Sequence, residues 1–378
     1  MPIFDIDYIL SLGRNDKCWC GSNLKFKHCH KDREREQPIS KGEVIQYEQN
    51  MSKREACYAP QELKLECTNI IKAHTVSKSS GLSDIADNTN HVLGLKQNLV
   101  SFQKSKGKLR FEKIGINKAS TFRGFCAKHD KQLFSCFEDI SFIGTQEQCT
   151  ALTYRSVAKE IYAKENALEV AGFIKKMDQG KPLIFQINIQ EHNFFYQLGL
   201  KAAINELYII KNDVDSELLS RGNSSYNFLV IESSSSIPVV VSSVINPTQD
   251  FNGEPIQDLS DLSVKPEYLV FNAFSSAGKG FVVFSWLKKA KIIDRFIQSL
   301  LSIDNNEMYS YLVNFFFSSA ENSFISPSWW EDLSDIQRNK IEELFNIGSD
   351  SFVDAPRNVL ADNNVKFTGW YIDNIYRV

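Results

Sequence analysis

The sequence lacks the long apolar runs and the export signal of membrane and secreted proteins. No stretch reaches the roughly 18 uninterrupted apolar residues that a membrane-spanning helix needs. Near the amino terminus, Asp5 and Asp7 stand where a secretory leader carries basic residues. Apolar residues make up 43% of the 378 residues and charged residues 24%, a balance that excludes collagen-like and disordered chains. We expect a globular cytoplasmic protein without a membrane segment.

Cysteine and histidine are missing from most of the chain. Cys149 is the last of eight cysteines, and His192 is the only one of six histidines beyond residue 129. An amino-terminal third rich in thiols and imidazoles, in a chain without an export signal, indicates metal binding rather than disulfides. We expect Cys136 and Cys149 to be buried as small apolar side chains.

Charge is also unevenly distributed along the chain. Residues 1–135 hold 23 of the 43 Lys and Arg but only 15 of the 46 Asp and Glu, so their formal balance is +8 against −11 for the rest. A basic half favours an anionic partner. Chance variation between surfaces is the alternative.

A compact Cys/His motif occupies residues 13–30. Its ligand spacing is C-x-C-x8-C-H, formed by Cys18, Cys20, Cys29 and His30. Three thiolates and one imidazole are a tetrahedral set that zinc prefers. A segment this short has no apolar core of its own, so it should fold only around a metal ion.

This segment resembles the SEC-C motif family. The shared features are Gly-Arg-Asn at 13–15, Cys-Gly-Ser at 20–22, the Lys-Phe-Lys at 25–27 and the final Cys-His pair. The resemblance implies a zinc module that docks on protein or ribosomal partners and has no catalytic role. Asn23 stands where the family usually has Gly, and Asn also tolerates a positive φ. His28 competes with His30 as a ligand, and we expect it to be solvated.

A second Cys/His region follows. We expect a second zinc site from Cys57, Cys67, Cys126 and His129, whose two halves lie far apart in sequence, as in treble-clef folds. Asp130 could assist as an acceptor behind the histidine.

The order of residues in this region also resembles an HNH endonuclease scaffold over residues 57–131. The resemblance implies His74 as general base, with Asn90 and His91 near a catalytic divalent metal. Ala73 stands where such enzymes carry an acid or a second His, and the C-x9-C spacing is longer than their C-x2-C. An active nuclease, a silent zinc module of the same shape and purely structural roles for Cys67, His74 and His91 all stay open.

A basic tract at 104–131 overlaps this region. Its cations are Lys104, Lys106, Lys108, Arg110, Lys113, Lys118, Arg123, Lys128 and Lys131, and Phe102, Phe111, Phe122, Phe125 and Phe134 lie in or beside it. Clustered cations neutralise phosphates, which favours nucleic acid as a partner. For the Phe side chains we expect burial in the core.

The remaining chain predicts an α+β fold. Helical spacing marks 151–177 and 194–210, and β-branched or aromatic runs predict strands at 183–189, 228–232, 237–245, 267–274, 280–287 and 367–372. The residues SSAGK between the two strands at 267–287 indicate a hairpin. We divide the chain into a zinc module at 1–31, a linker at 32–55, a Cys/His zinc region at 56–139 and an α+β domain of unreadable role at 140–378.

Three functions fit these features. The first is a zinc protein, with one or two zinc ions, that binds nucleic acid through the HNH-like region and could cleave it. The second is a non-catalytic, zinc-stabilised adaptor that binds protein partners through the SEC-C-like module. The third is a defence or toxin effector with its chemistry in the carboxy-terminal domain.

Overall fold

The computed structural model describes residues 2–51, 53–95, 110–220, 224–261, 263–347, 358–361 and 364–378. The chain forms two compact units. Unit 1 consists of Met1–Glu55 and Ile161–Ile209, and unit 2 consists of Ala56–Glu160 and Ile210–Val378. The four-part division of the sequence stays a prediction.

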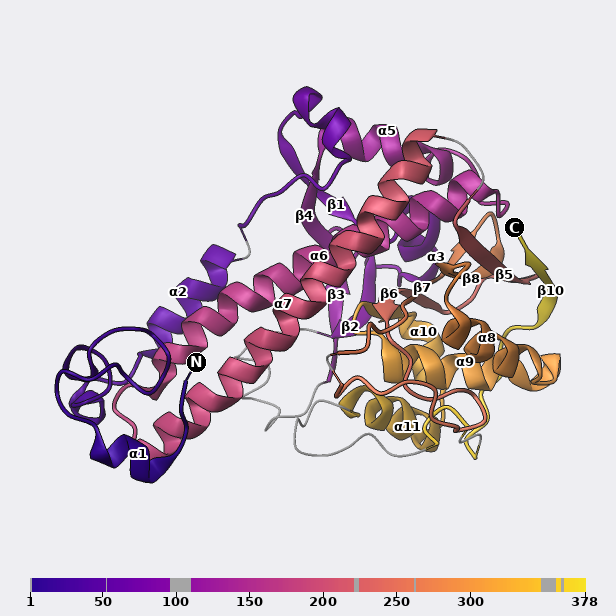
Figure 1. Ribbon diagram of the computed structural model, residues 1–378. Helices are drawn as coiled ribbons and strands as arrows, with labels where there is room; N and C mark the ends of the chain where they lie inside the picture. The colour runs from indigo at the N-terminus through magenta and orange to yellow at the C-terminus, as the bar shows by residue number, and fades with distance from the viewer. Residues whose placement is uncertain are drawn as a thin grey trace. The chain divides into compact units, whose positions relative to one another are not determined.

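Helices dominate unit 1. Its elements are α1 (Ile6–Ser11), η1 (Phe26–His28), η2 (Arg33–Arg35), α2 (Lys41–Met51), η5 (Lys175–Asp178) and the adjoining parts of α6 (Gln146–Ile174) and α7 (Leu183–Ser220). Helices α6 and α7 run side by side (Figure 1), and Asn193 Nδ2 donates to the carbonyl of Ala171 at 2.8 Å between them. Helix α2 packs on α6, where the rings of Tyr47 and Phe173 stack with centroids 4.2 Å apart.

The strand expected at 183–189 is wrong, because these residues begin helix α7. The segment is so short that its apolar positions fit both the alternation of a strand and the 3.6-residue period of a helix; these positions are 183, 184, 185, 187 and 189. The helical period places Leu183 and Ile187 on one face, four residues apart, and both belong to the apolar cluster that contains Trp19. Tertiary burial of that face therefore selects the helix.

Unit 2 is built on an antiparallel sheet of eight strands. In sheet order these are β10 (Ile372–Arg377), β5 (Tyr226–Ser233), β8 (Lys279–Leu287), β7 (Leu269–Ser276), β6 (Val239–Ile245), β9 (Ser323–Ile325), β2 (His91–Leu95) and β3 (Phe111–Gly115). The strands predicted at 228–287 are confirmed as β5 to β8. The predicted closing strand at 367–372 is displaced, because Phe367 and Trp370 are buried in the core and pairing with β5 starts at Ile372.

Helices cover both faces of this sheet. Helices α8 (Lys291–Leu301), α9 (Asn305–Ser319) and α11 (Asp335–Asn346) pack on one face, where Phe271 of β7 meets Phe315 of α9 at 4.5 Å between ring centroids (Figure 1). On the other face, Ser156 of α6 bonds Asn272 Oδ1 at 3.0 Å. Strand β7 is consequently buried along its whole length, including its polar residues Asn272, Ser275 and Ser276.

The predicted hairpin between the last two central strands is confirmed. Strands β7 and β8 are joined through Ala277 and Gly278, whose φ angles are +52° and +79°. Two successive positive φ angles are typical of the type I′ turn, whose twist matches that of the flanking strands.

A smaller sheet completes unit 2. Strands β1 (Ile70–His74) and β4 (Thr121–Cys126) pair antiparallel, and α5 (Ala127–Glu138) follows β4 directly. The remaining short elements are η3 (Gln61–Glu66), η4 (Lys78–Leu82), α3 (Ser83–Ile85) and α10 (Pro327–Asp332). Helices and antiparallel sheets occur without βαβ alternation, which confirms the α+β class.

Candidate metal centres

The SEC-C-like segment brings its four predicted ligands together in unit 1. Nδ1 of His30 lies 3.2 Å from the Cys18 sulfur and 3.1 Å from the Cys29 sulfur, and the sulfurs of Cys20 and Cys29 are 3.5 Å apart. All four ligand atoms lie within 4.8 Å of one another. Ligands about 2.0–2.3 Å from a tetrahedral zinc ion stand at comparable separations, so the donor set fits zinc. We call this group centre 1.

Two residues with positive φ shape centre 1. Lys17 and Lys25 form an isolated β-bridge that closes the loop carrying Cys18 and Cys20. Gly21 has φ +76° and Asn23 has φ +62°. Asn23 therefore adopts the left-handed conformation that Gly takes without strain, as expected for its place in the motif.

A buried carboxylate stands behind the histidine of centre 1. Nε2 of His30 lies 2.8 Å from Oδ2 of Asp178, a residue without solvent exposure. Arg33 Nε and Gln190 Nε2 each donate to Asp178 at 2.6 Å. A carboxylate in this position fixes the ring so that Nδ1 faces the metal, and it raises the basicity of the ligand.

Sequence reasoning missed Asp178. It is separated from His30 by 148 residues, and no local motif marks it. Only the packing of the module beside the start of α7 brings the two together. That packing is apolar: Ile9, Trp19 and Ile187 are 2%, 2% and 5% exposed. Unit 1 thus supplies the core that the short motif lacks.

The second predicted ligand set also converges, in unit 2. Nδ1 of His129 lies 3.4 Å from the Cys57 sulfur, 3.6 Å from Cys67 and 3.2 Å from Cys126. These four ligand atoms also lie within 4.8 Å of one another, and three sulfurs with one imidazole again suit zinc. We call this group centre 2.

The local fold explains how distant residues meet at centre 2. Cys126 ends β4 and is the N-cap of α5, so His129 lies in the first helical turn. The segment of Cys57 runs beside β4, because Tyr58 N donates to the carbonyl of Gly124 at 2.9 Å. Cys67 follows η3. A cysteine-bearing segment, the end of β4 and the first turn of α5 thus meet at centre 2.

In each centre one thiol has a lowered pKa, while the pKa of another, Cys18 in centre 1 and Cys67 in centre 2, is raised. Hydrogen bonds from the thiols of Cys18 and Cys29 lower the pKa of Cys20. Burial opposes ionisation of Cys126, but hydrogen bonds from Thr68 and His129 outweigh it and lower its pKa to about 7. By contrast, burial raises the pKa of Cys136 to about 11 and that of Cys149 to about 12, so neither of these thiols is poised for chemistry.

The expected role of Asp130 behind His129 is wrong. His129 is fully buried and its Nε2 has no hydrogen-bond partner among the described residues. Adjacent residues of a helix point about 100° apart, and Asp130 is directed instead toward Arg155, at 3.6 Å. Arg155 is fully buried, pairs with Glu138 at 2.8 Å and lies 3.9 Å over the ring of Phe134. Burial raises the pKa of Asp130.

The three candidate catalytic residues make backbone contacts. Nε2 of His74 lies 3.0 Å from the carbonyl of Ile116, and burial lowers the pKa of His74. The carbonyl of Asn90 accepts from the Ile116 amide at 3.0 Å, and Nδ1 of His91 lies 2.8 Å from the carbonyl of Thr89. Within the described ranges, the groups of three or more possible metal ligands are the two Cys/His centres, and neither includes these residues. Their catalytic roles stay predictions.

The basic tract is partly described. Lys104, Lys106 and Lys108 lie outside the described residues, as does Phe102. Lys113 pairs with Asp87 at 2.9 Å, Lys128 pairs with Glu66, and Lys131 pairs with Asp139. Phe122, Phe125 and Phe134 are buried, as expected, and so are not available for base stacking.

Comparison with known proteins supports the first motif. Residues 14–32 match the family model of the SEC-C motif. The chain carries a SEC-C motif. Its match includes all four ligands of centre 1. No curated protein and no solved structure gives a significant match to the chain. None of the described helices combines the length and apolar character needed to cross a bilayer.

Proposed function

We propose that this protein is a non-catalytic interaction protein, stabilised by two zinc ions, that binds a partner protein. The observation that carries the proposal is the completeness of both ligand sets: each centre brings three sulfurs and one imidazole nitrogen together. A catalytic zinc site keeps a position open for water or substrate, whereas a structural site has four protein ligands. We also propose a cytoplasmic location, because reducing conditions keep such thiols available for metal.

Exposed apolar side chains in unit 1 support a protein partner. Leu10 of α1 is 70% exposed, and Phe185 and Phe195 of α7 are 56% and 58% exposed. Exposed apolar side chains mark an interaction surface when they form a contiguous patch, and we propose that these three belong to one. The SEC-C motif, which the resemblance associates with docking, belongs to the same unit.

Nucleic-acid binding is the second candidate. It is supported by the nine Lys and Arg residues in the tract at 104–131 and by the exposure of Arg110 and Lys118. The ion pairs of Lys113, Lys128 and Lys131 favour the first proposal, because paired cations release fewer counterions on binding phosphate.

A paired assay separates the two proposals. The purified chain is mixed with plasmid DNA and with single-stranded RNA, in Mg²⁺ or Mn²⁺, at low and moderate salt. We expect no cleavage and no salt-dependent binding. Cleavage that needs the divalent ion and is lost in His74→Ala would overturn the proposal in favour of a nuclease. Salt-dependent binding without cleavage, lost in Arg110→Ala/Lys118→Ala, would replace it with the second candidate.

A further inference from the structure

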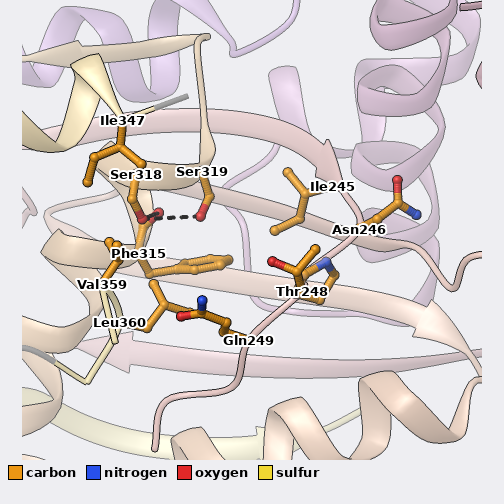
Figure 2. Close-up of a pocket in the computed structure, with 11 residues that line it drawn as sticks. Ile245, Asn246, Thr248, Gln249, Phe315, Ser318, Ser319, Ile347, Val359 and Leu360 are labelled. Carbon is orange, nitrogen blue, oxygen red and sulfur yellow. Dashed lines mark hydrogen bonds between the residues drawn. The ribbon is translucent and has the colours of Figure 1, made fainter. Parts of the chain in front are cut away.

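A surface that a protein could contact lies on unit 1, not at the cavity of unit 2. That cavity measures about 230 Å³, and its lining residues Phe315 and Leu360 are 0% and 7% exposed, so they belong to the core (Figure 2). A protein partner needs side chains that stand in water, over roughly 800 Å² on each side. Helix α7 carries five large apolar side chains that are between 43% and 58% exposed within unit 1: Ile184, Phe185, Phe195, Leu198 and Ile209.

Helix α7 has one buried side and one exposed side. Four residues at seven-residue spacing are at most 6% exposed and mark the buried side: Gln186, Asn193, Leu200 and Leu207. At about 100° per residue, the opposite side carries residues that recur at alternating steps of four and three. We call these residues the α7 stripe, and each of them is exposed or half-exposed: Ile184, Asn188, Glu191, Phe195, Leu198, Ala202, Asn205 and Ile209.

The α7 stripe has nearly the same order of side chains in both directions. Its midpoint is the peptide bond between residues 196 and 197, and side chains at equal distance from it are alike in three of four pairs. Two copies of a helix related by a twofold axis run antiparallel, so each residue meets its counterpart across the midpoint. The pairs are Ile184 with Ile209, Asn188 with Asn205, Phe195 with Leu198, and Glu191 with Ala202.

The charges of α7 also fit a second copy. In the twofold arrangement Glu191 meets Ala202 of the second copy, next to Lys201, so a carboxylate and an ammonium come together on both sides of the axis. Within one helix Glu191 and Lys201 are ten residues apart, about 15 Å along the axis, which is too far for an ion pair. At the other edge of the stripe His192 meets Gly199 of the second copy.

We propose that the partner is a second copy of this chain, and that two α7 helices pack antiparallel along the α7 stripe. This inference rests on the proposed interaction function and names its partner. Phe195 and Leu198 form the apolar centre of the contact, and the two isoleucines close its ends. The stripe is about 38 Å long. The Asn pairs between centre and ends fix this register, as a polar residue in the seam does in coiled coils.

Sedimentation equilibrium of the full zinc-loaded chain tests the dimer. We expect a dissociation constant at or below about 10 µM. Phe195→Glu/Leu198→Glu should raise it at least about 30-fold, because both residues lie at the centre and each occurs twice in the contact. Ile336→Glu is the control, since Ile336 is 69% exposed in α11, outside the stripe. A wild-type chain that stayed monomeric at about 100 µM, or an equal effect of both variants, would overturn the proposal.

Charge reversal tests the antiparallel arrangement. Glu191→Lys and Lys201→Glu should each weaken the dimer at least about threefold, since each places like charges together twice. The double variant Glu191→Lys/Lys201→Glu should restore the wild-type dissociation constant. Roles within one chain would not give this rescue, because the two residues are too far apart along the helix. A dimer that ignored both single reversals, or a double variant weaker than either, would contradict the arrangement.

The dimer and the proposed function can fail separately. A monomeric chain that holds two zinc ions and does not act on nucleic acid would overturn the dimer and keep the proposed function. A dimer that is lost in Phe195→Glu/Leu198→Glu but cleaves nucleic acid would keep the contact and overturn the proposed function.

Discussion

Centre 1 and centre 2 have the same donors but are supported in opposite ways. At centre 1 the ligands are close in sequence, and a buried carboxylate from residue 178 holds His30. At centre 2 the ligands span residues 57 to 129, and the imidazole Nε2 of His129 has no partner among the described residues. Centre 2 instead lies where β4, which pairs with β1, leads into the start of α5. Orientation thus comes from a hydrogen bond in one centre and from secondary structure in the other.

The largest effect is expected from Cys126→Ser. Cys126 is fully buried between β4 and α5, and the binding free energy of a structural zinc ion is folding free energy. We expect loss of one zinc ion and a fall in the melting temperature of unit 2 on the order of 10 °C. Calorimetry with metal analysis checks this. A variant that kept both zinc ions and melted like wild type would show that Cys126 does not hold a metal ion.

Cys18→Ser should have a large but local effect. It removes one ligand of centre 1, whose motif has little core of its own, so residues 13–31 should lose protection in hydrogen exchange. The main calorimetric transition of unit 2 should stay where it is, since Cys18 belongs to unit 1. Loss of protection throughout unit 2 would mean that the two centres are coupled.

Asp178→Asn tests the difference between the centres. Losing the carboxylate behind His30 should weaken zinc binding at centre 1 by about 10–100-fold, measured by competition with a chromophoric chelator. Asp130→Asn is the matched control at centre 2, because Asp130 is directed toward Arg155. Zinc affinity at centre 2 should not change in that control. If Asp178→Asn weakened zinc binding at centre 1 no more than Asp130→Asn weakened it at centre 2, the two centres would not differ in how their histidines are supported.

The smallest effect concerns pH and His74. Burial lowers the pKa of His74 below its ordinary value near 6.5, so the folded state binds this proton less readily than the unfolded state. The neutral His74 contributes its full share to the free energy of unfolding above about pH 6.5, and this contribution is lost as the pH falls through the pKa of the folded state. His74→Gln should remove that part of the acid destabilisation, measured as the difference between urea titrations at pH 7.5 and 5.5. An identical pH dependence in both proteins would contradict the shift.

The sequence could predict residues whose chemistry is fixed, including the widely separated ligands of centre 2, and elements that a local pattern determines. The ligands of centre 1 are close together and carry fixed chemistry, so their spacing was sufficient. The central strands and the turn at Ala277 and Gly278 were also local. Asp178 could not be found this way, because its role exists only after α7 packs beside the motif. The same packing explains why the apolar residues at 183–189 form a helix and not the strand that the sequence predicts.

Native mass spectrometry of the zinc-loaded chain tests the central claim most directly. The account predicts two zinc ions in the wild-type protein, one in Cys18→Ser, one in Cys126→Ser and none in the double variant. A wild-type chain that stayed folded with no bound zinc, or single variants that still carried two ions, would contradict it.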